Sequence, residues 1–186
     1  RGYKRETKGF LLLTGNETAQ QVGDEPLQFK SKFPEVKVAV DEDRVHGIEE
    51  LRKMDTKPDV ILLDDAFQHR KVKAGLNILL TPYGDLYSKD QVLPTGNLRE
   101  SRGGAGRAQL VVVTKCPLDL DESEKTLIQK ELKLENEQQL FFSGITYGME
   151  ISNGEAFREL KSLKDEDFTL ISGIANPAPL VDHLQS

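Results

Sequence analysis

Residues 59–70 have the sequence Asp-Val-Ile-Leu-Leu-Asp-Asp-Ala-Phe-Gln-His-Arg, in which a short apolar run is followed by closely spaced polar side chains. Four consecutive apolar residues, 60–63, are typical of a strand buried on both faces of a parallel sheet. Asp64 and Asp65 follow directly, at the strand end where open α/β sheets bind their ligands. An imidazole and a guanidinium, from His69 and Arg70, come shortly after.

Two interpretations of this stretch are open. Phosphoryl-transfer enzymes place an aspartate at such a strand end, where it holds the magnesium ion that bridges the nucleotide phosphates. A strand that simply ends in a polar turn would also carry adjacent carboxylates. We favour the ligand site, because Gln68, His69 and Arg70 follow at once and ionisable groups cluster in this way at functional sites.

Length and composition indicate a globular chain. Its 186 residues are enough for one domain, or for one domain and part of another. No apolar stretch approaches the length of a transmembrane helix. The single cysteine, Cys116, cannot form an internal disulfide and is expected to pack at a strand end. The chain starts at Arg1 without a signal-peptide pattern and stops inside an expected helix, so we expect both ends to be cuts.

Charge is distributed unevenly along the chain. The net charge is −6, yet residues 66–115 carry eight Lys/Arg against three Asp/Glu, a local excess of +5. Residues 116–167 carry six against thirteen, a balance of −7 that is typical of a solvated face. A basic segment beside a candidate metal site favours an anionic ligand such as a nucleotide. Nucleic-acid binding is not expected, because the chain is acidic and lacks a basic-aromatic pattern.

Strand and helix patterns alternate, which predicts an α/β fold with a mostly parallel sheet flanked by helices. One helix is expected near Asp24 and Pro26, another over Asp43–Met54, a third after a capping-box pattern at Asp121 and Glu124, and a last one over Pro179–Leu184. Strands are expected at Gly9–Thr14, Val36–Val40, Val60–Leu63, Leu76–Leu80, Leu110–Thr114 and Phe168–Ser172, with a hairpin at Phe141–Ile151.

Residues 81–107 are rich in Gly, Pro and Arg and show little periodicity. A loop this long is usually functional. Arg99, Arg102 and Arg107 lie among its glycines, where they would either contact an anion or only keep the loop soluble.

Several motifs together resemble one family. They are Arg1-Gly2-Tyr3, Gly23-Asp24-Glu25-Pro26, Asp64-Asp65-Ala66-Phe67-Gln68-His69-Arg70, Leu93-Pro94-Thr95-Gly96-Asn97-Leu98-Arg99-Glu100 and Val113-Thr114-Lys115-Cys116-Pro117. In this order they resemble the tetraacyldisaccharide 4′-kinases, the lipid A 4′-kinases of Gram-negative bacteria. Ser172-Gly173-Ile174-Ala175-Asn176-Pro177 resembles the strand-to-helix turn of that family's second domain. Ala66 stands where glycine is more usual.

The resemblance implies a P-loop NTPase-like fold and a lipid kinase. Such an enzyme transfers the γ-phosphate of ATP to the 4′-hydroxyl of a tetraacylated disaccharide 1-phosphate at the cytoplasmic face of the inner membrane. The implied domains are the remainder of the N-terminal kinase domain at 1–140, a linking hairpin and connector at 141–167, and the beginning of a second α/β domain at 168–186.

The same resemblance implies roles for individual residues. Asp64 and Asp65 match the carboxylates that hold magnesium, and Asp24 matches the catalytic base that accepts the sugar hydroxyl's proton. Residues expected near the substrate or the nucleotide are Glu25, His69, Arg70, Arg99 and Glu100.

The chain departs from the family in one important respect. A P-loop requires Gly-x-x-x-x-Gly-Lys-Ser/Thr, and the 186 residues contain no such pattern. The resemblance puts that motif upstream of Arg1 and the histidine partner of Asp24 beyond Ser186. We therefore expect the chain itself to be an inactive part of a kinase.

Alternatives stay open for the whole chain and for single residues. The chain would otherwise be a P-loop phosphotransferase or NTPase acting on a soluble substrate, or a non-catalytic α/β binding module. Asp24 would otherwise be a helix N-cap, and His69 a loop histidine bonded to the backbone. His46 and His183 are expected to be structural or solvent-facing.

Overall fold

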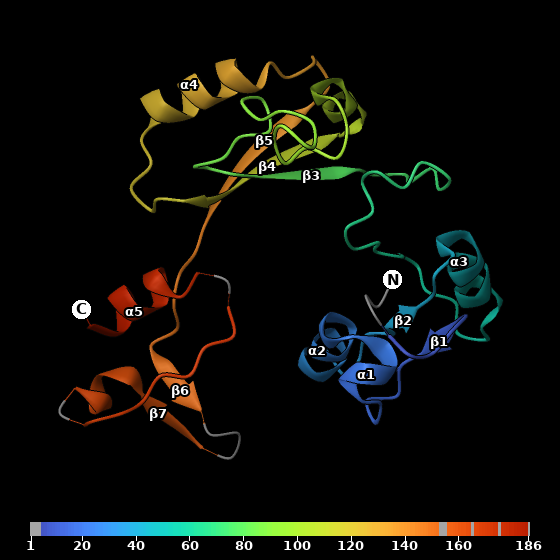
Figure 1. Ribbon diagram of the computed structural model, residues 1–186, viewed down its shortest axis with the longest axis horizontal. Coiled ribbons are helices and arrows are strands. Elements are labelled where there is room, and N and C mark those ends of the chain that lie inside the picture. The colour runs from blue at the N-terminus through green and yellow to red at the C-terminus, as the bar shows by residue number, and fades with distance from the viewer. Residues whose placement is uncertain (1–4, 153–155, 165, 175, 186) are drawn as a thin grey trace. The chain divides into compact units, whose positions relative to one another are not determined.

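The computed structural model describes residues 5–152, 156–164, 166–174 and 176–185, along which helices and short strands alternate (Figure 1). Two compact units are present. The first contains the chain up to Leu79 and Gln91–Leu110, and the second contains Leu80–Asp90 and the chain from Val111 onward. The Arg1-Gly2-Tyr3 motif and Ala175 lie outside the described residues.

The first unit contains a two-stranded sheet. Strands β1 (Leu11–Leu12) and β2 (Ala39–Val40) fall within the expected strands but are shorter, and they pair antiparallel, with Leu11 opposite Val40. Leu13, Val22 and Val40 are buried together beside them. The expectation of a mostly parallel arrangement is wrong for this pair, because the two strands belong to a small separate sheet.

Among the described residues of the first unit, two of the three α-helices begin with a side-chain cap. Helix α1 (Ala19–Val22) begins with a capping box formed by Thr18 and Gln21, a Thr-x-x-Gln signal that the sequence analysis missed. Helix α2 (Asp24–Lys32) begins after Gly23, whose φ of 93° suits glycine. Helix α3 (Arg44–Lys53) confirms the helix expected there, and the Asp43 carboxylate accepts hydrogen bonds from the first-turn amides.

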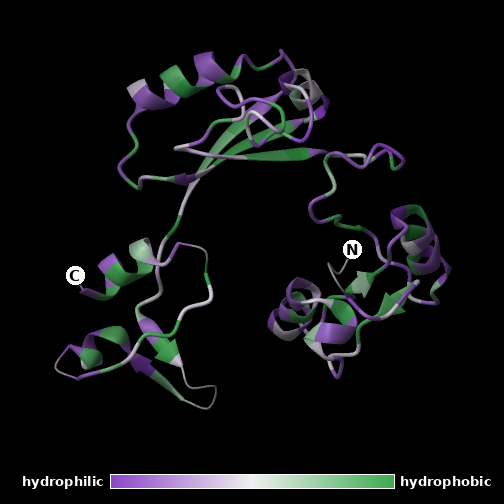
Figure 2. Ribbon diagram, in the orientation of Figure 1, coloured by the Kyte–Doolittle hydropathy of each residue, from purple (hydrophilic) through white to green (hydrophobic). Residues whose placement is uncertain are grey.

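A three-stranded parallel sheet confirms the α/β class. Its strands are β3 (Ile78–Pro82), β4 (Leu110–Cys116) and β5 (Gln139–Gly144), in the order β3-β4-β5. Helix α4 (Glu122–Leu132) connects β4 to β5 and is capped at Asp121, which accepts from the Glu124 amide at 2.8 Å. Figure 2 shows hydrophobic residues along the strands of this sheet, while hydrophilic and hydrophobic residues alternate along α4.

The core of the second unit lies between the sheet and α4. Val111 and Val113 on β4 are fully buried, and Ile128 and Leu132 on α4 are buried as well. Thr81 is also buried, and its hydroxyl accepts a hydrogen bond from the Tyr87 amide at 2.9 Å. The buried Thr81 hydroxyl therefore ties the loop that follows β3 to that strand.

The strand expected at Val60–Leu63 is not formed. These residues belong to no helix or strand, and the side chains of Val60 and Leu62 are 70% and 88% exposed. An apolar run becomes a strand only where a neighbouring strand pairs with it, and no such strand lies beside it in the described ranges. Phe168–Ser172 is likewise not a strand, and Ile171 is 92% exposed.

The hairpin expected at Phe141–Ile151 is wrong in position. Its first part is β5, and the antiparallel hairpin lies further on, in β6 (Glu150–Ser152) and β7 (Phe157–Glu159). Gly144 is the last residue of β5 and lies close to β4, since a Cβ there would be 3.0 Å from the Cys116 carbonyl oxygen. The final helix is confirmed as α5 (Ala178–Gln185). The remaining short elements are the 3-10 turns η1 (Arg102–Arg107) and η2 (Leu160–Leu163). The domain boundaries expected from the sequence remain a prediction.

Candidate active site

The Asp64–Asp65 pair forms an exposed turn directly after the apolar run. The turn requires a left-handed residue, and Asp65 has φ 41°, a conformation that aspartate tolerates better than most residues. Arg44, the first residue of α3, donates from Nη2 to the carbonyl oxygens of Asp64 at 3.2 Å and Asp65 at 2.9 Å. The backbone of the turn is thus tied to the start of a helix.

Arg99 contacts the carboxylate of Asp65 from the long loop. Its Nη1 lies 3.0 Å from Oδ1 and 2.9 Å from Oδ2, although the two residues are 34 positions apart. Both side chains are more than half exposed, so the pair is solvated and contributes little to stability. The Asp65 carboxylate raises the pKa of Arg99, chiefly through these hydrogen bonds.

Glu100, the next residue, forms a less exposed ion pair with Arg107 at the end of η1. The Arg107 guanidinium donates to Oε1 at 2.6 Å and to Oε2 at 3.0 Å. It also donates to the Phe67 carbonyl oxygen at 3.1 Å and stacks over the Phe67 ring, 4.8 Å from the centroid. The hydrogen bonds from Arg107 lower the pKa of Glu100, with smaller contributions from Arg70 and Gln68.

His69 is half-buried within the turn that follows Asp65. Its amide donates to the Ala66 carbonyl oxygen at 2.8 Å, which closes a turn over residues 66–69. Its Nε2 is buried and has no hydrogen-bond partner among the described residues. The loop-histidine alternative therefore accounts for the backbone of His69 but not for its ring.

Asp24 and Glu25 occupy the first turn of α2 and are exposed. The alternative that Asp24 is an N-cap is wrong, because Gly23 has that position and α2 has no side-chain cap hydrogen bond. The positive end of the helix dipole lies beside both carboxylates. In the described part of the chain, neither residue shares a hydrogen bond or ion pair with the Asp64–Arg107 network.

The structure brings together residues that are far apart in the sequence. Asp65, Arg70, Arg99 and Glu100, all expected at the site, belong to one network that also includes Arg107. Arg44 was missed, because nothing in its local sequence indicates a contact with carbonyl groups 20 residues away.

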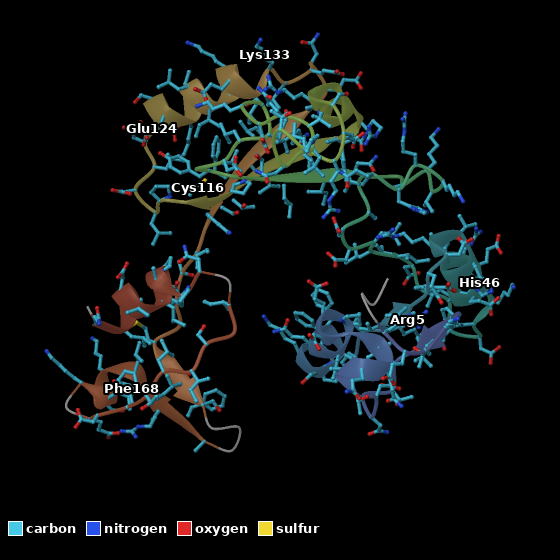
Figure 3. All side chains as sticks on the ribbon, in the orientation of Figure 1. Arg5, His46, Cys116, Glu124, Lys133 and Phe168 are labelled. Atoms are coloured by element: carbon cyan, nitrogen blue, oxygen red, sulfur yellow. The ribbon has the colours of Figure 1, made fainter. Side chains whose placement is uncertain are left out.

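The other chemistry-bearing residues have structural partners. His46 lies on α3 (Figure 3). Its Nδ1 is 2.7 Å from Oδ2 of the buried Asp41. His183 stacks on Tyr147 with ring centroids 4.5 Å apart. Cys116 is buried, and desolvation raises its pKa, which disfavours a reactive thiolate. No group of three or more His, Cys, Asp or Glu able to hold a metal occurs among the described residues.

Comparison with known proteins assigns the chain to one protein family. The profile of one family, described as tetraacyldisaccharide-1-P 4′-kinase, matches residues 1–186. The chain belongs to this family.

Curated relatives support the same assignment. The chain is 53% identical over 186 residues to a tetraacyldisaccharide 4′-kinase of Flavobacterium johnsoniae and 50% identical over 196 residues to one of Bacteroides fragilis. Both alignments cover 100% of this chain but 55% and 51% of those relatives, so the chain spans about half their length. No solved structure matches the chain. Within the described residues, no helix has the length and apolar character needed to cross a bilayer.

Proposed function

We propose that the natural protein carrying these residues phosphorylates the 4′-hydroxyl of a tetraacylated disaccharide 1-phosphate, with ATP as donor. The observation that carries the proposal is the family match along the whole chain. The clustering of Asp65, Arg70, Arg99 and Glu100 supports it, because phosphoryl transfer depends on positioned charge rather than on a covalent intermediate.

Asp64 and Asp65 are the residues that would hold magnesium. Magnesium in nucleotide enzymes is held by one or two carboxylates and completed by phosphates and water. An exposed turn with two adjacent carboxylates fits that requirement better than a closed protein cage does. A magnesium ion held there would neutralise charge on the transferring phosphoryl group.

Asp24 is the proposed general base. Its carboxylate lies on the first turn of α2, exposed and without a capping role, so it is available to accept the proton of a substrate hydroxyl. Glu25 beside it is proposed to contact the sugar. His69, Arg70, Arg99 and Glu100 are proposed to contact the nucleotide or the substrate headgroup, either directly or through one another.

The acceptor that the family name describes is amphiphilic, with four acyl chains on a charged disaccharide. We therefore propose that the protein works at a membrane surface, the cytoplasmic face of the inner membrane, and not on a soluble sugar. Nucleic acid is not proposed as a partner, since the chain has a net charge of −6.

The test is a transfer assay with the purified natural protein, radiolabelled ATP and magnesium. Two acceptors are compared, the tetraacyl disaccharide 1-phosphate in mixed micelles and the same disaccharide without acyl chains. We expect label on the 4′-position of the acylated acceptor, and much less transfer to the soluble one. Preferred transfer to the soluble acceptor would favour a soluble-substrate phosphotransferase, and no transfer to either would favour a binding module.

A further inference from the structure

Arg107 makes three different contacts with one guanidinium. It binds both carboxylate oxygens of Glu100, donates to the Phe67 carbonyl oxygen and covers the Phe67 ring. The side chains of Arg107 and Glu100 are 32% and 26% exposed, less than those of the Arg99–Asp65 pair. Because the donors of a guanidinium are rigid and planar, these contacts hold Glu100 and Phe67 in one orientation relative to Arg107.

Gly104 lies directly behind this ion pair. It is buried, and a Cβ at this position would lie 2.6 Å from Glu100 Cδ, 2.7 Å from Oε2 and 3.0 Å from Arg107 Nη1. The preceding glycine, Gly103, is exposed, and a Cβ there would meet only Ser101 Oγ at 3.9 Å. Of the two neighbouring glycines, only Gly104 is placed so that an added methyl group would displace the Glu100 carboxylate.

The loop segment 99–107 thus meets the acidic turn at two points. Arg99 reaches the carboxylate of Asp65, and Arg107 reaches the backbone and ring of Phe67, two residues further on. We propose that Gly104 and Arg107 are positioning residues that fix Glu100 and the Asp64–Phe67 turn relative to each other. This role rests on the proposed kinase function, and it assigns Arg107 to positioning and not to anion binding.

The main test compares two alanine variants in the natural protein. Gly104→Ala pushes the Glu100 carboxylate aside without changing any charge, whereas Gly103→Ala adds the same methyl group in open space. We expect Gly104→Ala to lower kcat about tenfold or more with little change in the KM for ATP, because misplaced groups act mainly on the transition state. Gly103→Ala should behave as wild type.

Arg107→Lys serves as a second variant, in case Gly104→Ala folds poorly. Lysine keeps the positive charge but cannot bind both Glu100 oxygens and the Phe67 carbonyl in one plane. We expect kcat to fall as in Gly104→Ala, and the melting temperature to stay within a few degrees of that of the wild type. Wild-type kcat in both Gly104→Ala and Arg107→Lys, with Asp64→Asn strongly impaired, would overturn the positioning role while leaving the kinase function standing.

Hydrogen exchange gives a readout independent of activity. The His69 amide is protected by the Ala66 carbonyl, and the segment around it depends on Phe67 being held. Exchange of peptides covering 64–70 should be faster in Gly104→Ala and Arg107→Lys than in Gly103→Ala. Equal exchange in all three variants would refute the positioning role even if the protein proved to be inactive as a kinase.

Discussion

Asp65 illustrates how much of the candidate site depends on single residues. Its φ of 41° turns the chain, its carbonyl accepts from Arg44, and its carboxylate accepts from Arg99. Glycine would adopt the turn with less strain but would lose the carboxylate. The position therefore combines a conformational requirement with a chemical one.

Asp24→Asn separates the proposed catalytic role from a structural one. Because Gly23 is the N-cap and Asp24 makes no capping bond, the substitution removes only a charge near the helix dipole, worth about 0.3–1 kcal/mol. We expect kcat to fall about 10²-fold or more, while the free energy of unfolding barely changes. Activity assays and urea denaturation of the natural protein measure the two quantities.

A matched control is Glu122→Gln, which removes a first-turn carboxylate from α4. It should cost a similarly small stability without affecting kcat. Lost stability with retained turnover in Asp24→Asn would instead support a structural role for Asp24.

His46 gives a prediction for pH dependence. Its hydrogen bond to Asp41 raises its pKa, and Glu50 and Lys53 on the same helix, with Asp43 at the cap, are the other charges that face it. A raised pKa in the folded state means that the contribution to stability is complete below about pH 6.5, the usual value, and is lost as pH rises through the folded value.

We therefore expect the melting temperature of wild type to exceed that of His46→Gln by more at pH 6 than at pH 9. Thermal unfolding at the two pH values provides the measurement. The same difference at both values would show that protonation of His46 does not contribute to stability.

For individual residues, the sequence motifs singled out Arg99 and Glu100 but did not predict their contacts. That both residues lie near the substrate or the nucleotide stays a prediction. In the structure, Arg99 forms an ion pair with Asp65, and Glu100 forms one with Arg107. These partners were not predictable, because the loop has no periodicity that would indicate in which direction each side chain points. Asp24 and Glu25 were expected at the same site and lie on a different element.

At the scale of elements, prediction succeeded where signals were local. Helices α3 and α4 form where they were expected, and α4 begins after Asp121, the first residue of the expected capping pattern. Strand β4 has an alternating pattern of burial. The prediction of a strand at Val60–Leu63 was wrong. A strand needs a neighbouring strand to pair with, and the apolar sequence of these four residues does not show whether one is present. The hairpin expected at Phe141–Ile151 was wrong as well, and Gly144 within that range instead permits a close approach to the Cys116 carbonyl at the end of β4.

Gly144→Ala tests that explanation. The added Cβ would lie 2.8 Å from Leu118 Cδ2 and 3.0 Å from the Cys116 carbonyl oxygen, and the carbonyl belongs to a paired strand that cannot move freely. We expect a loss of about 1–3 kcal/mol in the free energy of unfolding, as for overpacked sites. Gly148→Ala is the control, because its nearest atom would be 3.9 Å away. Equal stability of the two variants would contradict the role assigned to Gly144.

At the scale of the whole molecule, the chain consists of two compact units, and the network from Arg44 to Arg107 belongs to the first. The α/β class was predictable from the alternation of patterns and is confirmed by the three-stranded sheet. The antiparallel pairing of β1 with β2 was not, because pairing direction is set by tertiary contacts and not by composition.

The central proposal is that the Asp64–Asp65 turn holds magnesium in a natural protein that phosphorylates a lipid. The most direct test measures 4′-phosphorylation by the natural protein at limiting magnesium, comparing wild type with Asp64→Asn and Asp65→Asn. Asp59→Asn, an exposed aspartate in the same stretch, is the control. We predict losses of about 10²-fold or more in the two turn variants, partly recovered at high magnesium, and none in the control. Wild-type rates in both turn variants at limiting magnesium would contradict the claim.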